Sequence, residues 1–304
     1  MMRWSGNYDP VDVPLSWTKA GGLVILHDER YSSHDVMGSS CRGSGLFALP
    51  DGGAPARALS VGAPACYADG AVAVAPDGTW AVFSQRMLPN NSGLARLEIA
   101  TSRLDTLPTA CAVYLQGPAI SPDGARIAAV GLCRDRDQEH WTLYVMNRDG
   151  SGLRPLSTHP ADQAAPSWAP GGDHLAAGQD GHVVVLAAEG EGRRALTRGG
   201  APSWSPDGAW IAFVDSIPGG ERNAMGIFVV RPDGSGRREV FRNAERGTFE
   251  RGWGPRREGE PGAALVWSPD ARWIAFPRRF DAGVSVWRVE AATGRVEQVT
   301  RASR

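Results

Sequence analysis

The stretch Ser203-Trp204-Ser205-Pro206-Asp207-Gly208 runs directly into the apolar segment 209–213, and similar stretches recur along the chain. Close copies stand at residues 73–78, 119–124 and 266–271, and worn copies stand at residues 16–21 and 167–172. A repeat at this spacing is typical of an architecture in which one supersecondary unit is stacked on its neighbours. The motif residues are therefore expected to be structural rather than chemical.

Each copy predicts a tight hairpin followed by a buried strand. Proline suits the first central position of a type I turn, aspartate suits the next, and glycine can take a positive φ to close the hairpin. The strand that follows is apolar on both faces, which is typical of burial on both sides. Its two key positions are apolar in all copies: Val24 and Leu26, Ala81 and Phe83, Ile127 and Ala129, Leu175 and Ala177, Ile211 and Phe213, Ile274 and Phe276. The motif aspartates are expected to be turn formers, not catalytic groups: Asp77, Asp123, Asp207 and Asp270.

Each unit ends with a second hairpin, most clearly at Asp149-Gly150 and Asp233-Gly234, where Asp-Gly pairs separate alternating runs. Six units of four antiparallel strands predict an all-β, six-bladed β-propeller, in which radial repetition leaves only short edges. We expect residues 1–304 to form this single domain. The last blade should supply its own outer strand over Arg295–Thr300, and pairing of residues 1–14 with that blade is the open alternative. The expected blades span residues 15–60, 71–108, 117–157, 165–197, 201–241 and 264–300.

The phrase at Trp204–Gly208 resembles the Trp-Ser-Pro-Asp-Gly repeat of TolB-like propellers, also called WD-like propeller repeats. The resemblance covers essentially residues 15–301, and the first and fourth copies depart from it because they lack the motif aspartate. It implies the six-bladed fold. It leaves the function open, because the superfamily includes protein-binding scaffolds, regulatory domains of peptidases and a few lyases.

Composition excludes several functional classes. A net charge of −1 gives no general argument for nucleic-acid binding. The sequence contains no run of about 18 apolar residues, so no membrane-spanning helix is predicted. The first residues lack the apolar region of a signal peptide, so a cytoplasmic monomer is expected, or a periplasmic or secreted one if a signal was removed. The Gly-x-Ser-x-Gly elbow of an accompanying peptidase domain and the P-loop pattern are both absent from the sequence. The basic residues are arginine except Lys19, which we attribute mainly to coding bias.

Strand order predicts two different rims. The Pro-Asp-Gly and Asp-Gly turns share one rim, which we call the tight-turn rim. The opposite rim, which we call the long-loop rim, carries the second-to-third strand loops and the crossovers between blades. Nearly all the length variation lies there, for example at residues 28–44, long enough to form a lid, and at residues 242–263. Variable loops on a rigid scaffold usually carry function, so the long-loop rim is the expected functional face.

The segment 242–263 combines aromatic and arginine residues, which are typical anchors of interfaces. Arginine also binds carboxylates through two parallel hydrogen bonds. We therefore predict a non-catalytic binding module that presents this rim to a protein or to a small acidic ligand. The alternative is a solvated insert whose aromatic residues pack on the scaffold. The predicted binding residues are Phe249, Arg251, Trp253, Arg256 and Arg257.

The competing hypothesis is an enzyme, namely a lyase, hydrolase or isomerase with its active site at the mouth of the central channel. Charged residues and histidines at the ends of the second strands would converge there as general acids and bases, although no pair has a spacing that argues for this. The candidate catalytic residues are His27, Asp28, His34, Arg134, His140 and Asp215, with Arg86 and Arg278 at similar strand ends.

Cysteine and histidine spacing gives no local metal signature, so no cofactor is predicted. Some TolB-like lyases hold a metal with histidines from several blades, and this resemblance makes His27, His34, His140 and His159 the candidates for a divalent metal. Asp135, Asp137 and Glu139 lack the glycine and distal glutamate of a calcium loop. The four cysteines permit two local disulfides, 41–66 and 111–133, while four free thiols are the default in a cytoplasm.

Overall fold

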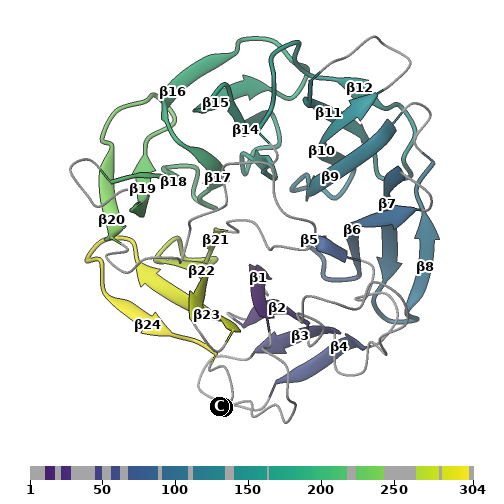
Figure 1. Cartoon of the computed structure of the whole chain (residues 1–304), viewed down its shortest axis with the longest axis horizontal. Helices are drawn as coiled ribbons and strands as arrows, with labels where there is room; N and C mark the ends of the chain where they lie inside the picture. Colours follow the sequence, from purple (N-terminus) through teal and green to yellow (C-terminus); the bar gives the residue numbers. More distant parts are fainter. Residues whose placement is uncertain are drawn as a thin grey trace.

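The computed structural model describes residues 11–17, 22–28, 45–49, 56–61, 68–87, 91–108, 112–133, 140–162, 164–217, 224–242, 265–280 and 283–300. Over these ranges the chain is all-β, and its strands form six four-stranded antiparallel blades arranged in a ring (Figure 1). The predicted fold class is therefore confirmed.

Each blade consists of four consecutive strands, of which the first is innermost and the fourth lies at the outer edge (Figure 1). Blade 1 comprises β1 (Val11–Trp17), β2 (Leu23–Asp28), β3 (Gly45–Leu49) and β4 (Arg57–Val61), and blade 2 comprises β5 (Ala68–Val74), β6 (Trp80–Met87), β7 (Asn91–Glu98) and β8 (Arg103–Thr106). Blade 3 comprises β9 (Ala112–Ile120), β10 (Arg126–Cys133), β11 (Thr142–Asn147) and β12 (Arg154–Pro155), and blade 4 comprises β13 (Ser167–Trp168), β14 (His174–Gln179), β15 (His182–Ala187) and β16 (Arg194–Arg198). Blade 5 comprises β17 (Gly200–Trp204), β18 (Ile211–Ser216), β19 (Met225–Val230) and β20 (Arg238–Arg242), and blade 6 comprises β21 (Val266–Trp267), β22 (Trp273–Phe280), β23 (Gly283–Glu290) and β24 (Val296–Gln298).

Blade 6 supplies its own outer strand, as predicted, because β24 pairs antiparallel with β23. β1 lies innermost in blade 1 and also touches blade 6 through one parallel bridge, Val11 to Val284. The same kind of bridge joins Ser92 of blade 2 to Tyr114 of blade 3. Neighbouring blades are thus linked where the inner strand of one begins beside the third strand of the other.

The core lies between the blades, and the second strands contribute to it on both faces. In blade 4, Leu175 and Ala177 pack with residues of blade 3, while Ala176 packs with residues of blade 5. Eleven of the twelve apolar positions predicted from the repeat have described side chains, and all eleven are buried. This double burial explains why the sequence of these strands does not alternate between apolar and polar residues.

The motif turns of blades 3, 5 and 6 have one hydrogen-bond pattern. In blade 5, the Ser205 hydroxyl donates to Asp207 Oδ1 at 2.6 Å and accepts the backbone N–H of Trp210 at 2.9 Å. The same carboxylate oxygen accepts the N–H of Ala209 at 3.0 Å. Ser121 with Asp123, and Ser268 with Asp270, repeat the hydroxyl-to-carboxylate contact at 2.5 Å and 2.6 Å. The motif aspartates therefore form turns, as predicted.

Motif tryptophans join neighbouring blades. The indole N–H of Trp168 donates to Ala119 O of blade 3 at 3.1 Å, and that of Trp267 donates to Ser203 O of blade 5 at 2.9 Å. Trp17 makes the matching contact with Val266 O of blade 6 at 3.3 Å. Trp204 differs, because its indole donates within its own blade, to Gly208 O at 3.4 Å. The repeated tryptophan is thus chiefly a link between inner strands.

Arginines at one register of the fourth strand form a second link between blades. Arg154, Arg194 and Arg238 pair with Val145, Val185 and Val229, and each guanidinium donates to carbonyls in the last turn of the next blade. The acceptors include Ala188 O at 3.3 Å, Asp233 O at 3.1 Å and Ala291 O at 2.7 Å. Blade 6 has Glu297 at this register, opposite Arg288, so it breaks the pattern.

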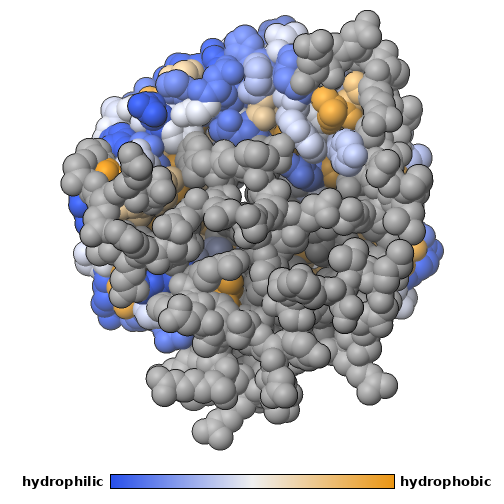
Figure 2. Space-filling model, viewed as in Figure 1, coloured by the Kyte–Doolittle hydropathy of each residue, from blue (hydrophilic) through white to orange (hydrophobic). Residues whose placement is uncertain are grey.

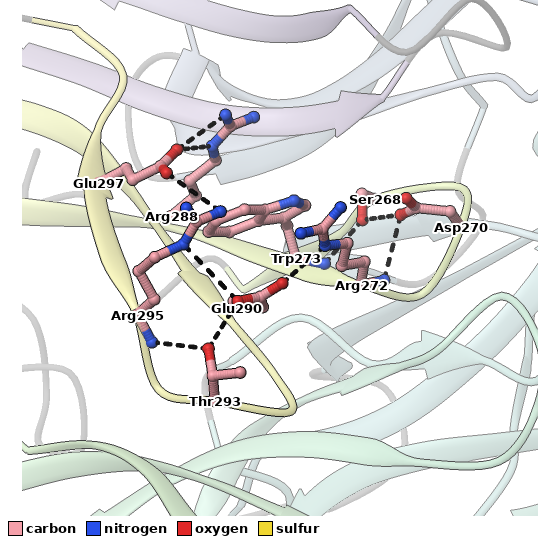
Figure 3. A network of polar contacts seen from close by, with 9 residues as sticks. All are labelled: Ser268, Asp270, Arg272, Trp273, Arg288, Glu290, Thr293, Arg295 and Glu297. Atoms are coloured by element: carbon pink, nitrogen blue, oxygen red, sulfur yellow. Dashed lines mark hydrogen bonds and ion pairs between the residues drawn. The ribbon is translucent and has the colours of Figure 1, made fainter.

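Figure 3 shows the polar contacts of Glu297 and its neighbours in blade 6. Guanidinium groups surround the Trp273 indole, with the carbon atoms of Arg288 and Arg295 4.5 and 4.9 Å from a ring centroid. Glu297 pairs with both arginines, and Glu290 accepts hydrogen bonds from Thr293 at 2.6 Å and Arg272 at 2.7 Å. These hydrogen bonds hold the pKa of Glu290 below its ordinary value. Arginine stacked on tryptophan is therefore part of the scaffold.

Candidate functional site

The crossover from blade 3 to blade 4, residues 156–166, is described at every position except 163. Backbone hydrogen bonds fix it to both blades. The N–H of Ala161 donates to Trp141 O at 2.8 Å in blade 3, and the N–H of Asp162 donates to Gly178 O at 2.9 Å in blade 4. This part of the long-loop rim is consequently held in place by main-chain contacts.

Several half-buried polar and aromatic side chains lie on or beside this crossover. The Tyr114 and Trp141 rings lie 6.0 Å apart and are tilted by 44°. A ring nitrogen of His140, Nε2, lies 3.1 Å from Thr158 O, next to His159. We call Tyr114, His140, Trp141, His159 and Asp162 the blade 3–4 platform. It combines two aromatic rings, two imidazoles and one carboxyl on the rim that the sequence predicts to be functional.

Asp162 is the one described carboxyl group whose pKa is raised. Burial is the largest cause, and the nearby Asp180 adds to it, while a hydrogen bond from the Gly181 N–H and the nearby His182 act in the opposite direction. The Oδ2 atom is buried and has no hydrogen-bond partner among the described residues. A Cβ placed on Gly178 would lie 2.5 Å from this oxygen, so the carboxyl needs glycine at that position.

Residues 162 and 164–166 lie outside the regular ladder of blade 4, and we call them the inner bulge. Ala161 bridges to Gln179, and the next regular pair is Ser167 with Ala176. Within the inner bulge, Ala164 belongs to a buried cluster formed mainly by blades 5 and 6. The backbone of Ala165 lies 3.0 Å from where a Cβ on Gly117 of blade 3 would be. The inner bulge therefore packs against inner strands of several blades.

Blade 4 has a tight connection on both rims. Asp180 and Gly181 join β14 to β15 with positive φ values of 54° and 71°, which is the geometry of a type I′ hairpin. At this blade the long-loop rim therefore has a short turn, and the neighbouring crossover packs against inner strands. The Asp180-Gly181 pair between apolar runs is the signal in the sequence that could have revealed this exception.

Two predicted catalytic candidates point along the faces of their own blades. Asp215 Oδ2 accepts from Arg237 Nη2 at 2.8 Å, and the Arg237 guanidinium lies 4.3 Å from the Phe228 ring centroid. The Arg278 guanidinium lies 4.9 Å from the Trp287 ring centroid. Both groups are engaged by residues of the scaffold.

The remaining predicted residues are placed only in part. His27 and Asp28 are the last residues of β2, opposite Asp12 and Val11, and Arg86 is opposite Ser92 in blade 2. The structure brings His140 beside the segment that carries His159, and the described ranges contain no group of three or more potential metal-ligating residues. Predicted residues outside the described ranges are His34, Arg134, Phe249, Arg251, Trp253, Arg256 and Arg257, together with Asp135, Asp137 and Glu139.

Cys133 is buried and disulfide-bonded. It ends β10 opposite Ala112, the residue that follows Cys111 in the sequence. The other three cysteines lie outside the described residues, so the pairings 111–133 and 41–66 stay predictions.

The surface near the platform differs from that of the neighbouring blade. On the face shown in Figure 2, hydrophilic residues line the outer edge beside β15 and β16, whereas apolar residues gather beside β11 and β12. No helix among the described segments has the length and apolar character needed to cross a bilayer.

Comparison with known proteins identifies the fold. No family model matches the chain, and no curated protein matches it. The solved structure of a putative TolB from Agrobacterium tumefaciens is 22% identical with a TM-score of 0.61, over 80% of this chain and 83% of that chain. TolB from Acinetobacter baumannii is 11% identical with a TM-score of 0.63, over 98% of this chain and 66% of that chain. The fold is that of a TolB-like propeller.

The same architecture also occurs in an enzyme. An oligogalacturonate lyase from Vibrio parahaemolyticus is 11% identical to this chain with a TM-score of 0.56, over 91% of this chain and 90% of that chain. At these identities the likeness establishes the TolB-like fold, and the function has to be argued from the site.

Proposed function

We propose that this propeller is a non-catalytic binding module that presents its long-loop rim to a protein or to a small acidic ligand. The contrast between the two rims carries the proposal. On the tight-turn rim the polar side chains of the repeat bind one another or the next blade. On the long-loop rim the blade 3–4 platform holds half-buried aromatic and imidazole groups in fixed positions, which is a common composition of binding surfaces.

The likeness to TolB structures is compatible with this proposal, and the likeness to a lyase keeps catalysis as the alternative, which we place at the same rim. Under the binding proposal, the arginines of segment 242–263 contact carboxylates of the ligand, and Trp253 supplies buried area. Under the enzyme alternative, the same ligand would be converted.

Two double variants with equal changes in charge test which rim binds. The rim variant is Arg256→Ala with Arg257→Ala, and the control is Arg57→Ala with Arg103→Ala, two exposed arginines of the tight-turn rim. Calorimetric titration with a panel of mono-, di- and tricarboxylates and uronic acids measures small-ligand binding. Affinity capture followed by titration of the purified partner measures protein binding.

We expect the rim variant to weaken the dissociation constant by about tenfold or more, about 1.4 kcal/mol, and the control to change it by less than about twofold. Both variants should retain their melting temperatures to within a few degrees. Equal loss of binding in the two variants would refute the assignment to the long-loop rim. Conversion of a bound ligand, followed by mass spectrometry, would replace the binding proposal with the enzyme alternative.

A further inference from the structure

The inner bulge, residues 162 and 164–166, includes a half-buried carboxyl group with one enclosed oxygen. Asp162 Oδ2 is enclosed against Gly178 and lacks a donor among the described residues. A charged oxygen buried without a donor is costly, whereas a neutral carboxyl can leave one oxygen unpaired at a much smaller cost.

The charged groups that face Asp162 come from the β14–β15 turn. Asp180 repels a second negative charge, and His182 attracts one when it is protonated. Arg193 lies 3.3 Å from the Asp180 carboxylate and offsets part of this repulsion. The inner strands against which the bulge packs, β9, β17 and β21, contain no carboxyl group, arginine, lysine or histidine in their sequences. Tyr114 in β9 is their one titratable side chain. The local balance therefore depends mainly on Asp162 itself.

The contacts that would be lost on release are few and well defined. The N–H groups of Ala161 and Asp162 each donate one backbone hydrogen bond, to blade 3 and blade 4 respectively. The Asp162 carboxyl also accepts a hydrogen bond from the Gly181 N–H. Ala164 and Ala165 add small apolar contacts with other inner strands. A segment held by so few contacts can open locally without unfolding of the blades.

We propose that the inner bulge is a pH-dependent latch, seated across the inner strands when Asp162 is protonated and loosened when Asp162 ionises. Release moves Oδ2 from its enclosed position into water, and it frees the carbonyl of Gly178 on the inner side of blade 4. This inference concerns the conformation of the ring centre and does not depend on the proposed binding function.

The direction of the pH effect follows from the raised pKa of Asp162. A carboxyl whose pKa is higher in the folded chain favours the seated state at low pH. That contribution is lost as the pH rises from the ordinary aspartate pKa of about 3.9 to the raised value. The bulge is thus held more firmly in acid than at neutral pH.

Amide hydrogen exchange of the full chain, corrected for the intrinsic effect of pH, tests the latch. The reporters are the Ala161 and Asp162 amides, and the amides of β18 monitor the rest of the fold. Wild-type protection at the reporters should be several-fold lower at pH 7.5 than at pH 4.5, because only the protonated carboxyl favours the seated state. Asp162→Asn should remain protected at both pH values, because its side chain is neutral. Asp180→Asn, the matched control, should retain a pH dependence.

A second variant keeps the test decisive if Asp162→Asn folds poorly. Gly178→Ala places a methyl group 2.5 Å from Oδ2, so it should leave the reporters weakly protected at both pH values while β18 stays protected. The proposal is overturned if wild-type protection does not change with pH. It is also overturned if Asp162→Asn shows the wild-type pH dependence, or if Gly178→Ala leaves the reporters protected.

Discussion

At the tight-turn rim of blades 3, 5 and 6, a serine hydroxyl binds a motif aspartate at 2.5–2.6 Å and accepts a backbone N–H from the following strand. At the long-loop rim of blades 3 and 4, the main contacts differ from one another. A ring nitrogen of His140 lies within hydrogen-bond distance of Thr158 O. The backbone N–H groups of Ala161 and Asp162 donate to Trp141 O and Gly178 O. The first rim stabilises the fold by repeating one set of contacts, whereas each of the contacts described at the second rim occurs once.

The largest effect is expected for the buried hydroxyl of the repeated turn. Ser268→Ala removes the side-chain acceptor of the Trp273 N–H and the donor to Asp270, in a buried setting. The cost should be about 1–3 kcal/mol of unfolding free energy, because buried polar groups lose their partners. Ser216→Ala at the long-loop rim, where the serine is exposed, should stay within about 0.5 kcal/mol. Denaturant unfolding measures both, and equal losses would contradict the contrast between the rims.

A smaller difference should separate two motif tryptophans. Trp267→Phe removes a 2.9 Å hydrogen bond between blades, whereas Trp204→Phe removes a 3.4 Å contact within one blade. We expect a loss of about 1 kcal/mol or more for the first and clearly less for the second, since the Ser203 carbonyl loses its donor. Thermal unfolding of the two variants gives the comparison. A larger loss of stability in Trp204→Phe than in Trp267→Phe would show that the hydrogen bond between blades is not the main contribution of the motif tryptophan.

One repeat position should improve on substitution. Ala271 has a φ of +56° where the other described motif copies have glycine, for example Gly208 at +74°. Ala271→Gly should raise stability by about 0.5–1 kcal/mol because it relieves a left-handed backbone at an alanine. Gly208→Ala is the reverse change and should lower stability by a similar amount. A decrease in melting temperature for Ala271→Gly would indicate that the turn tolerates the side chain without strain.

The smallest expected effect is on the pH dependence of stability, and it should have opposite signs at the two rims. The hydrogen bonds from Ser121 and from the Ala125 N–H hold the pKa of Asp123 below its ordinary value, so its contribution is present above about pH 4 and is lost in stronger acid. Asp123→Asn should therefore be less stable than wild type at neutral pH and equal to it in strong acid. Asp162→Asn should be more stable at neutral pH and equal in strong acid. Urea unfolding from pH 3 to pH 8 tests this, and curves of the same sign would contradict it.

The repeat made the architecture predictable because its signals are local. Proline, aspartate and glycine at consecutive positions fix a turn through their own backbone preferences, and the apolar strand after each turn can only be buried. The predicted turn role of Asp207 and the outer strand of blade 6 follow from these patterns and are confirmed. The arginines were underestimated, because their stacking on Trp273 depends on neighbouring strands and on no sequence spacing.

The sequence by itself determined that this chain is a six-bladed propeller and which side chains build its turns, because short-range backbone preferences and apolar patterns are repeated often enough to be unambiguous. Only the tertiary structure decided which groups meet on the long-loop rim. Asp162 packs against Gly178 because residues of the crossover leave the regular ladder. Asp215 accepts a hydrogen bond from Arg237 because both side chains lie along the face of blade 5. Such contacts join residues that are not neighbours in the sequence, and each occurs once, so the repeated pattern of the sequence could not predict them.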